Sequence, residues 1–143
     1  MAANELAVHT IKICCNTNVF KLKYQTALTN DIVSTAKDIA KLTMRANNVL
    51  VKSTQLAQLR LRYQYEAATK CNDMLTLIHL AKPVYHLPGR RVKYWAELII
   101  KTRQLTRAWH DANAQEYKSK GYIAYTTNMC WNFGYTKSKD SWH

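Results

Sequence analysis

The chain has 143 residues, 48% of them hydrophobic, so one ordinary domain can bury a core without disulfides or a structural metal. Lys and Arg outnumber Asp and Glu by 21 to 9, which gives a formal net charge of +12 at pH 7. Such an excess attracts polyanions, and together with the absence of any run of about 18 apolar residues it favours nucleic acid over a membrane as partner.

The first predicted helix begins at about Asn4, a good N-cap, and runs to about Tyr24. It carries two apolar stripes on nearly opposite sides. One contains Leu6, Thr10, Ile13, Thr17 and Phe20, and the other contains Val8, Ile11, Cys15, Val19 and Leu22. A helix that is apolar on two sides is buried on two sides. In so small a domain, one of these sides must be covered by another subunit. We therefore expect a homo-oligomer.

The second predicted helix is capped by Thr29, Asn30 or Asp31 and extends to about Lys52. Its core face contains Ile32, Ala36, Ile39, Ala40, Thr43, Ala46 and Leu50. Opposite this face, a narrow sector without acidic residues contains Lys37, Lys41, Arg45 and Lys52. A solvated face normally mixes both signs, so this basic stripe predicts contact with a phosphate backbone.

The third predicted helix begins at Ser53 or Thr54 and ends at about Ala81, because the residue before Pro83 is pushed away from helical geometry. Its core stripe contains Leu56, Leu59, Tyr63, Ala67, Met74, Leu77, Ile78 and Ala81. A weaker apolar strip on the far side contains Leu61, Tyr65, Ala68 and Leu75, and this second double pattern also leads us to expect an oligomer. Arg60 and Arg62 could extend the basic surface, although they point in different directions.

The fourth predicted helix has Pro88 in its first turn and ends near Glu116. Three residues at its start, Arg90, Arg91 and Lys93, oppose the helix dipole, so their charge does not serve helix stability. Arg103 and Arg107, one turn apart, form a further basic pair, and we expect both groups to lie on the surface and bind nucleic acid. Four helices with short links predict an all-α, antiparallel up-and-down four-helix bundle over residues 1–116.

The last segment, residues 117–143, mixes aromatic residues with lysines and has no helical period. We expect a short irregular aromatic tail, either a lid over the bundle or an arm that orders on a partner. Its aromatic side chains could stack unpaired bases, but such residues more often pack against their own domain.

No phosphate-binding glycine loop, nucleophile elbow or metalloprotease motif is present in the sequence. Cys14, Cys15, Cys71 and Cys130 lack the spacing of a zinc site, and the N-terminus lacks the features of a signal peptide. We therefore expect a cytoplasmic protein that is not an enzyme and needs no metal or cofactor. The alternative is a ribonuclease, because the spacing of Arg103 and His110 is similar to the motif of the helical HEPN ribonucleases.

With its helices placed, the chain resembles the four-helix-bundle family of the accessory variability proteins of diversity-generating retroelements and the proteins encoded in 23S ribosomal RNA intervening sequences. The resemblance covers about residues 5 to 112. It rests on the segment LTNDIVSTA from Leu28, on Arg62-Tyr63 leading to Glu66-Ala67, and on a last helix that ends in Leu105 and Trp109. The resemblance implies a homo-pentamer that binds RNA or DNA, with a reverse transcriptase as partner during mutagenic copying of template RNA. A structural protein that uses its charge on a protein or ribosomal surface is a third possibility.

Overall fold

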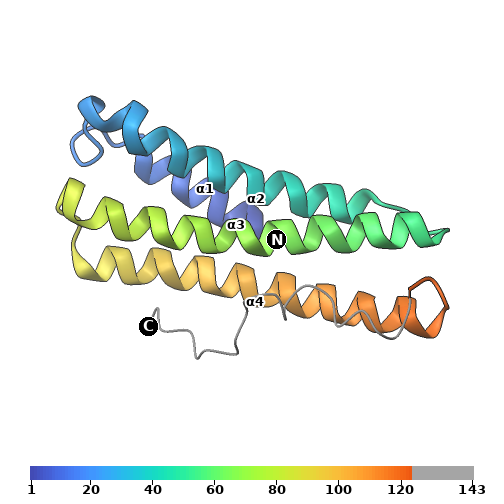
Figure 1. Ribbon diagram of the computed structural model, residues 1–143. Coiled ribbons are helices and arrows are strands. Elements are labelled where there is room, and N and C mark those ends of the chain that lie inside the picture. Colours follow the sequence, from blue (N-terminus) through green and yellow to red (C-terminus); the bar gives the residue numbers. More distant parts are fainter. Residues whose placement is uncertain (124–143) are drawn as a thin grey trace.

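The computed structural model describes residues 1–123, a part of the chain that is helical and contains no strand. The four α-helices are α1 (Ala2–Cys14), α2 (Asn30–Asn48), α3 (Thr54–Tyr85) and α4 (Gly89–Ser119). Successive helices run in opposite directions and pack against each other (Figure 1). The prediction of an all-α four-helix bundle is therefore confirmed, whereas the predicted tail lies outside the described residues from residue 124 onward.

The first helix differs most from its prediction, because α1 begins at Ala2 and ends at Cys14 instead of near Tyr24. The Asn16 side chain accepts a hydrogen bond from the backbone N–H of Asn18 at 3.2 Å, and such local bonds compete with helical geometry. A 3-10 turn (Leu22–Tyr24) and a π-helical turn (Gln25–Thr29) then lead into α2. As a result, α1 has only 13 residues against the 32 of α3, and it packs against α2 and α4 toward one end of the bundle (Figure 1).

The third helix begins as predicted and ends later than predicted. Ser53 is its N-cap, and its Oγ accepts a hydrogen bond from the backbone N–H of Leu56 at 3.3 Å. The prediction that the helix stops before Pro83 is wrong, since α3 continues through this proline. Pro83 lies in the last turn, and the helix ends at Tyr85, followed by the C-cap His86, whose φ of 52° is left-handed. The proline therefore interrupts the series of backbone hydrogen bonds only in the last turn, where the helix is about to end.

All residues of the two apolar strips of α3 are buried or half-buried, because this helix lies between α2 and α4. Ala67, Met74 and Ile78 of the predicted core stripe are buried, and so are Leu61 and Leu75 of the strip predicted to be weaker. The double pattern of this helix is therefore satisfied within one chain and gives no support for a partner subunit.

The last helix passes the predicted boundary between bundle and tail. Pro88 is the N-cap of α4, one position before its first residue, and the helix continues to Ser119 instead of ending near Glu116. Tyr117 and Ile123 are buried against Ala57 and Leu61 near the start of α3. The bundle therefore includes the first residues of the segment that the sequence assigned to the tail.

The core has a large apolar part at the α1 end and a small one at the opposite end. In the large part, Trp95 is fully buried and donates from Nε1 to the Thr10 hydroxyl at 3.1 Å, while Phe20 contacts Trp95 and Tyr85. The Tyr85 hydroxyl is hydrogen-bonded to that of Thr29, which ties α3 to the start of α2. Among the described residues, no helix is both long and apolar enough to cross a lipid bilayer.

Candidate nucleic-acid interface

The outer face of α2 presents a row of three basic side chains. Lys37, Lys41 and Arg45 are all exposed and recur every four residues, so they span about 12 Å along one side of the helix. The row exists because the opposite side of α2 is committed to the core, where Ile32 and Ile39 have no exposed surface. We call Lys37, Lys41 and Arg45 the α2 basic row.

Lys52 does not belong to this helical row, although the sequence predicted that it would. The helix ends at Asn48, and Val49 has extended backbone with ψ of 116°. Lys52 is exposed in the short link to α3. The valines that flank Leu50 in this link are β-branched and favour extended backbone over helix, which is consistent with the earlier end.

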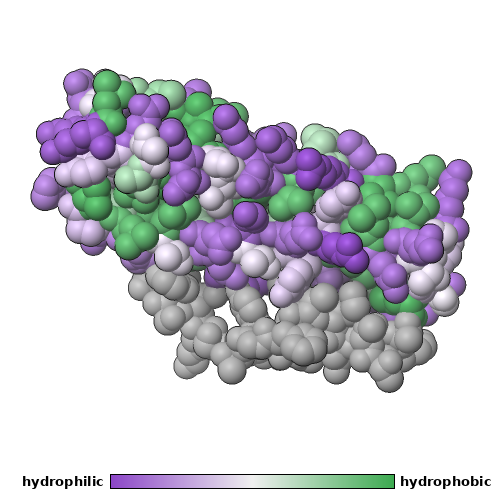
Figure 2. Space-filling view, turned by 45° about the horizontal axis from the view of Figure 1, so that its top comes forward, coloured by the Kyte–Doolittle hydropathy of each residue, from purple (hydrophilic) through white to green (hydrophobic). Residues whose placement is uncertain are grey.

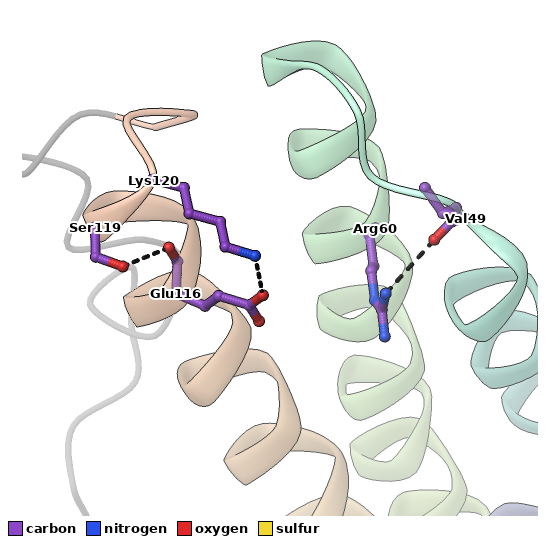
Figure 3. Close-up of polar contacts among 5 residues, drawn as sticks. All are labelled: Val49, Arg60, Glu116, Ser119 and Lys120. Carbon is purple, nitrogen blue, oxygen red and sulfur yellow. Dashed lines mark hydrogen bonds and ion pairs between the residues drawn. The ribbon is translucent and has the colours of Figure 1, made fainter.

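The two arginines of α3 have different surroundings. Arg62 is exposed, whereas Arg60 is half-buried and donates from Nη1 to the Val49 carbonyl at 3.5 Å (Figure 3). The guanidinium of Arg60 also lies 5.2 Å from the centre of the Trp109 ring. Arg60 therefore joins the link before α3 to α4, and Arg62 is the more accessible of the two.

The basic residues at the start of α4 lie near the C-terminal end of α1. Arg90 and Lys93 are exposed, and Arg91 is half-buried. The pKa of His9 on α1 is lowered, mainly because the imidazole is desolvated and secondly because Arg91 is close. These three residues thus add positive charge at the end of the bundle where α1 meets the turns that lead into α2 (Figure 1).

The middle of α4 is where the prediction of surface basic residues fails. Arg103 is only 1% exposed, and its Nη1 donates to the Asn72 side-chain oxygen of α3 at 2.8 Å. Arg107 is half-buried beside it. Burial raises the pKa of the nearby Cys71 thiol to about 12, an effect that both arginines partly oppose. Arg103 is therefore a core residue and does not lie on an exposed basic surface.

His110 shares this buried face with Arg103. It is 1% exposed, and its Nδ1 lies 3.0 Å from a carboxylate oxygen of Asp111. Close by, Gln64 donates from Nε2 to the Asn113 side-chain oxygen at 2.8 Å. A polar layer thus separates the two apolar parts of the core. The spacing that resembles a ribonuclease motif does place Arg103 and His110 on one side of α4, but that side faces inward.

A cavity beside the α2 basic row was missed by the sequence reasoning. It lies between the end of α1, the turns that follow and the first half of α2, and its volume is about 600 Å³. The prediction of one continuous helix to Tyr24 hid this hollow, because a helix over residues 15–24 leaves no turns to line it. The segment Asn16-Thr17-Asn18, which consists of poor helix formers, was the signal that could have revealed it.

No arrangement typical of a metal centre occurs in residues 1–123, where no three His, Cys, Asp or Glu side chains gather.

Apolar side chains also reach the surface in this part of the chain. Figure 2 shows them gathered mainly toward the two ends of one face, with mostly hydrophilic residues between them. The exposed large apolar residues include Val8, Ile11, Leu22, Leu50 and Leu105.

Comparison with known proteins gives no further guide to the site: no family model matches the chain, and neither a curated protein nor a solved structure is similar to it.

Proposed function

We propose that this protein is a non-enzymatic, oligomeric accessory protein that binds RNA or DNA through the α2 basic row. The observation that carries the proposal is the exposure of Lys37, Lys41 and Arg45 on one uninterrupted side of α2. Each cation can neutralise one phosphate and release its counterions, which makes the affinity strongly dependent on salt. Because lysine and arginine in such a row contact phosphates instead of base edges, the binding has little sequence preference.

The finer proposal is that the chain assists the reverse transcriptase of a diversity-generating retroelement during mutagenic copying of template RNA. It is supported by the order of the four helices and by the sequence resemblance described above. In this role the protein holds template RNA or complementary DNA in the cytoplasm while the polymerase copies it. Lys52, Arg62, Arg90 and Lys93 are exposed and can extend the contact beyond α2.

An exposed apolar side of α1 supports the proposal of an oligomer, which we take to be a pentamer. Val8 is 51% exposed and Ile11 is 37% exposed, although both belong to one of the two stripes that the sequence places on this helix. We expect light scattering to give a mass several times 16.6 kDa. Val8→Asp should lower that mass, because it places a charge in the contact. A wild-type monomer at micromolar concentration would contradict the pentamer.

Burial favours the binding proposal over the alternative of a ribonuclease. An imidazole that acts on a ribose hydroxyl must come within hydrogen-bonding distance of it. His110 and Arg103 are each 1% exposed and lie within the polar layer of the core. An RNA chain cannot reach either group without a rearrangement of α3 and α4.

The experiment that tests the proposal reverses the charge of the α2 basic row. Lys37→Glu, Lys41→Glu and Arg45→Glu together should lower the affinity for RNA by at least about 100-fold at low salt, while the circular dichroism spectrum stays helical. The matched control reverses Lys12, Lys82 and Lys101, three exposed lysines on three different helices, and changes the net charge equally. If both triple variants lose the same affinity, net charge and not the α2 basic row is responsible, and the proposed interface is wrong.

A further inference from the structure

We propose that the cavity beside the α2 basic row receives one unpaired base of a single-stranded nucleic acid whose phosphates lie on Lys37 and Lys41. This inference rests on the proposed function and adds to it a preference for single strands. Its starting point is the volume of about 600 Å³, which is within the usual range for a pocket that holds a small organic group.

The cavity and the α2 basic row are parts of one continuous surface. Asn30, Ser34, Lys37 and Lys41 all line the cavity, and their spacing of three or four residues places them on one side of α2. Arg45 continues the same line beyond the cavity. A strand whose phosphates follow the row toward the start of α2 is therefore led to the cavity.

The walls combine cationic and polar groups with an apolar part. Leu22 is 67% exposed at the cavity, Val33 is half-buried and Phe20 lies at the core side. Lys37 and Lys41 line the cavity from α2, and Lys21 and Lys23, which flank Leu22 in the sequence, are exposed. An apolar surface next to cations suits the flat face of a base attached to a phosphate backbone.

Asp38 is the acidic residue among the described side chains that line the cavity, and its charge opposes an anionic ligand. Lys70 of α3 compensates this charge, because its Nζ lies 3.8 Å from an Asp38 carboxylate oxygen. Lys37 and Lys41 therefore remain in excess at the cavity. The bases of a duplex are stacked inside it, so only a single strand can place a base between these groups.

Cys15 provides a direct probe, since it is exposed and lines the cavity. Burial raises the pKa of the neighbouring Cys14 thiol to about 12, and the pKa of Cys71 is raised to about 12 as well. Both remain protonated near neutral pH and react slowly with maleimides, because the thiolate is the nucleophile that adds to the maleimide double bond. With Cys130→Ser as background, alkylation by N-ethylmaleimide therefore reports mainly on Cys15.

The experiment compares the alkylation rate of Cys15 with saturating amounts of three probes: a short single-stranded RNA, the matching duplex and an abasic strand of the same length. The single strand should slow alkylation about 10-fold, whereas the abasic strand and the duplex should bind without this protection. Equal protection by the abasic strand would show that the backbone alone covers Cys15 and would overturn the inference. Saturable binding of the single strand without protection would also overturn it and leave the proposed function intact, whereas no binding of any probe would refute the proposed function itself.

A cavity-filling variant provides a second test that does not depend on cysteine chemistry. Ser34 is exposed and lines the cavity, so Ser34→Tyr should fill part of it and lower the affinity for the single strand about 10-fold, with little effect on the duplex. The control is Gln104→Tyr, which adds a tyrosine at an exposed position of α4 away from the cavity. If Ser34→Tyr and Gln104→Tyr bind the single strand equally well, the cavity does not hold a base.

Discussion

The α2 basic row and the basic residues in the middle of α4 lie in opposite environments, although both follow helical spacing. The side chains of Lys37, Lys41 and Arg45 are exposed to water, because no helix of residues 1–123 covers the outer side of α2. Arg103 faces α3 and is desolvated, so it needs internal partners such as the Asn72 side chain. The comparison shows that the packing of neighbouring helices decides whether a basic residue is available to a ligand or contributes to the core.

The α2 basic row and the buried Arg103 also differ in what they contribute to the stability of the fold. A buried cation loses its hydration and must recover that cost through hydrogen bonds and packing, so the loss of its side chain is expensive. An exposed lysine keeps its hydration, and its removal changes the folded state little. The α2 basic row is therefore free to be selected for binding, whereas Arg103 is constrained by the fold.

The largest effect that this comparison predicts is on folding. Arg103→Ala should lower the free energy of unfolding by about 3 kcal/mol, because it leaves a cavity and removes a hydrogen bond to Asn72. Lys41→Ala should change it by no more than about 0.5 kcal/mol. Urea denaturation followed by circular dichroism measures both values.

Arg103→Met serves as the control for volume, since methionine fills much of the space without the charge. It should be more stable than Arg103→Ala, because a well-packed apolar side chain often replaces a buried cation at little cost. If Arg103→Ala is as stable as Lys41→Ala, the Arg103 side chain does not lie in the core in solution, and the contrast between the two helices disappears.

A smaller effect concerns the salt dependence of nucleic-acid binding. Lys41→Gln should weaken RNA binding several-fold and reduce the slope of log affinity against log salt by about 0.7 to 0.9, the value for one lost phosphate contact. Arg103→Met removes the same charge from a buried position and should leave the slope unchanged. Titrations at several salt concentrations compare the two variants, and equal slopes in both would mean that only total charge matters.

Much of the bundle could be predicted because its signals are local. The apolar face of α2 has helical period, and Ser53 before α3 has the hydroxyl that an N-cap requires. The end of α1 was missed because periodicity continues past Cys14 even though the Asn16 side chain turns the backbone. Apolar spacing alone cannot detect a competing side-chain hydrogen bond.

The candidate site was only partly predictable, because its exposure depends on contacts between distant segments. Helical spacing was enough to place Lys37, Lys41 and Arg45 on one side of α2. The burial of Arg103 depends on its position opposite Asn72, 31 residues earlier in the chain. Similarly, Leu22 reaches a cavity with Lys41 only because α1 ends early. Such relations between helices are absent from a one-dimensional pattern.

The smallest predicted effect concerns His9, whose partial burial lies between the two extremes of the comparison. Its imidazole packs edge-on against the Tyr94 and Trp95 rings, and desolvation, with Arg91 nearby, lowers its pKa below the ordinary 6.5. Above pH 6.5 His9 is neutral in both the folded and the unfolded chain, so its contribution to stability is fully present. As the pH falls below 6.5, the unfolded chain binds the proton first, and this contribution is lost progressively down to the lower pKa of the folded state.

His9→Phe keeps an aromatic ring but cannot titrate. Because the other histidines are common to both proteins, the melting temperature of His9→Phe should fall less between pH 7.5 and pH 5.5 than that of the wild type. Parallel melting curves of the two proteins over this range would refute the prediction and place His9 in a fully hydrated environment.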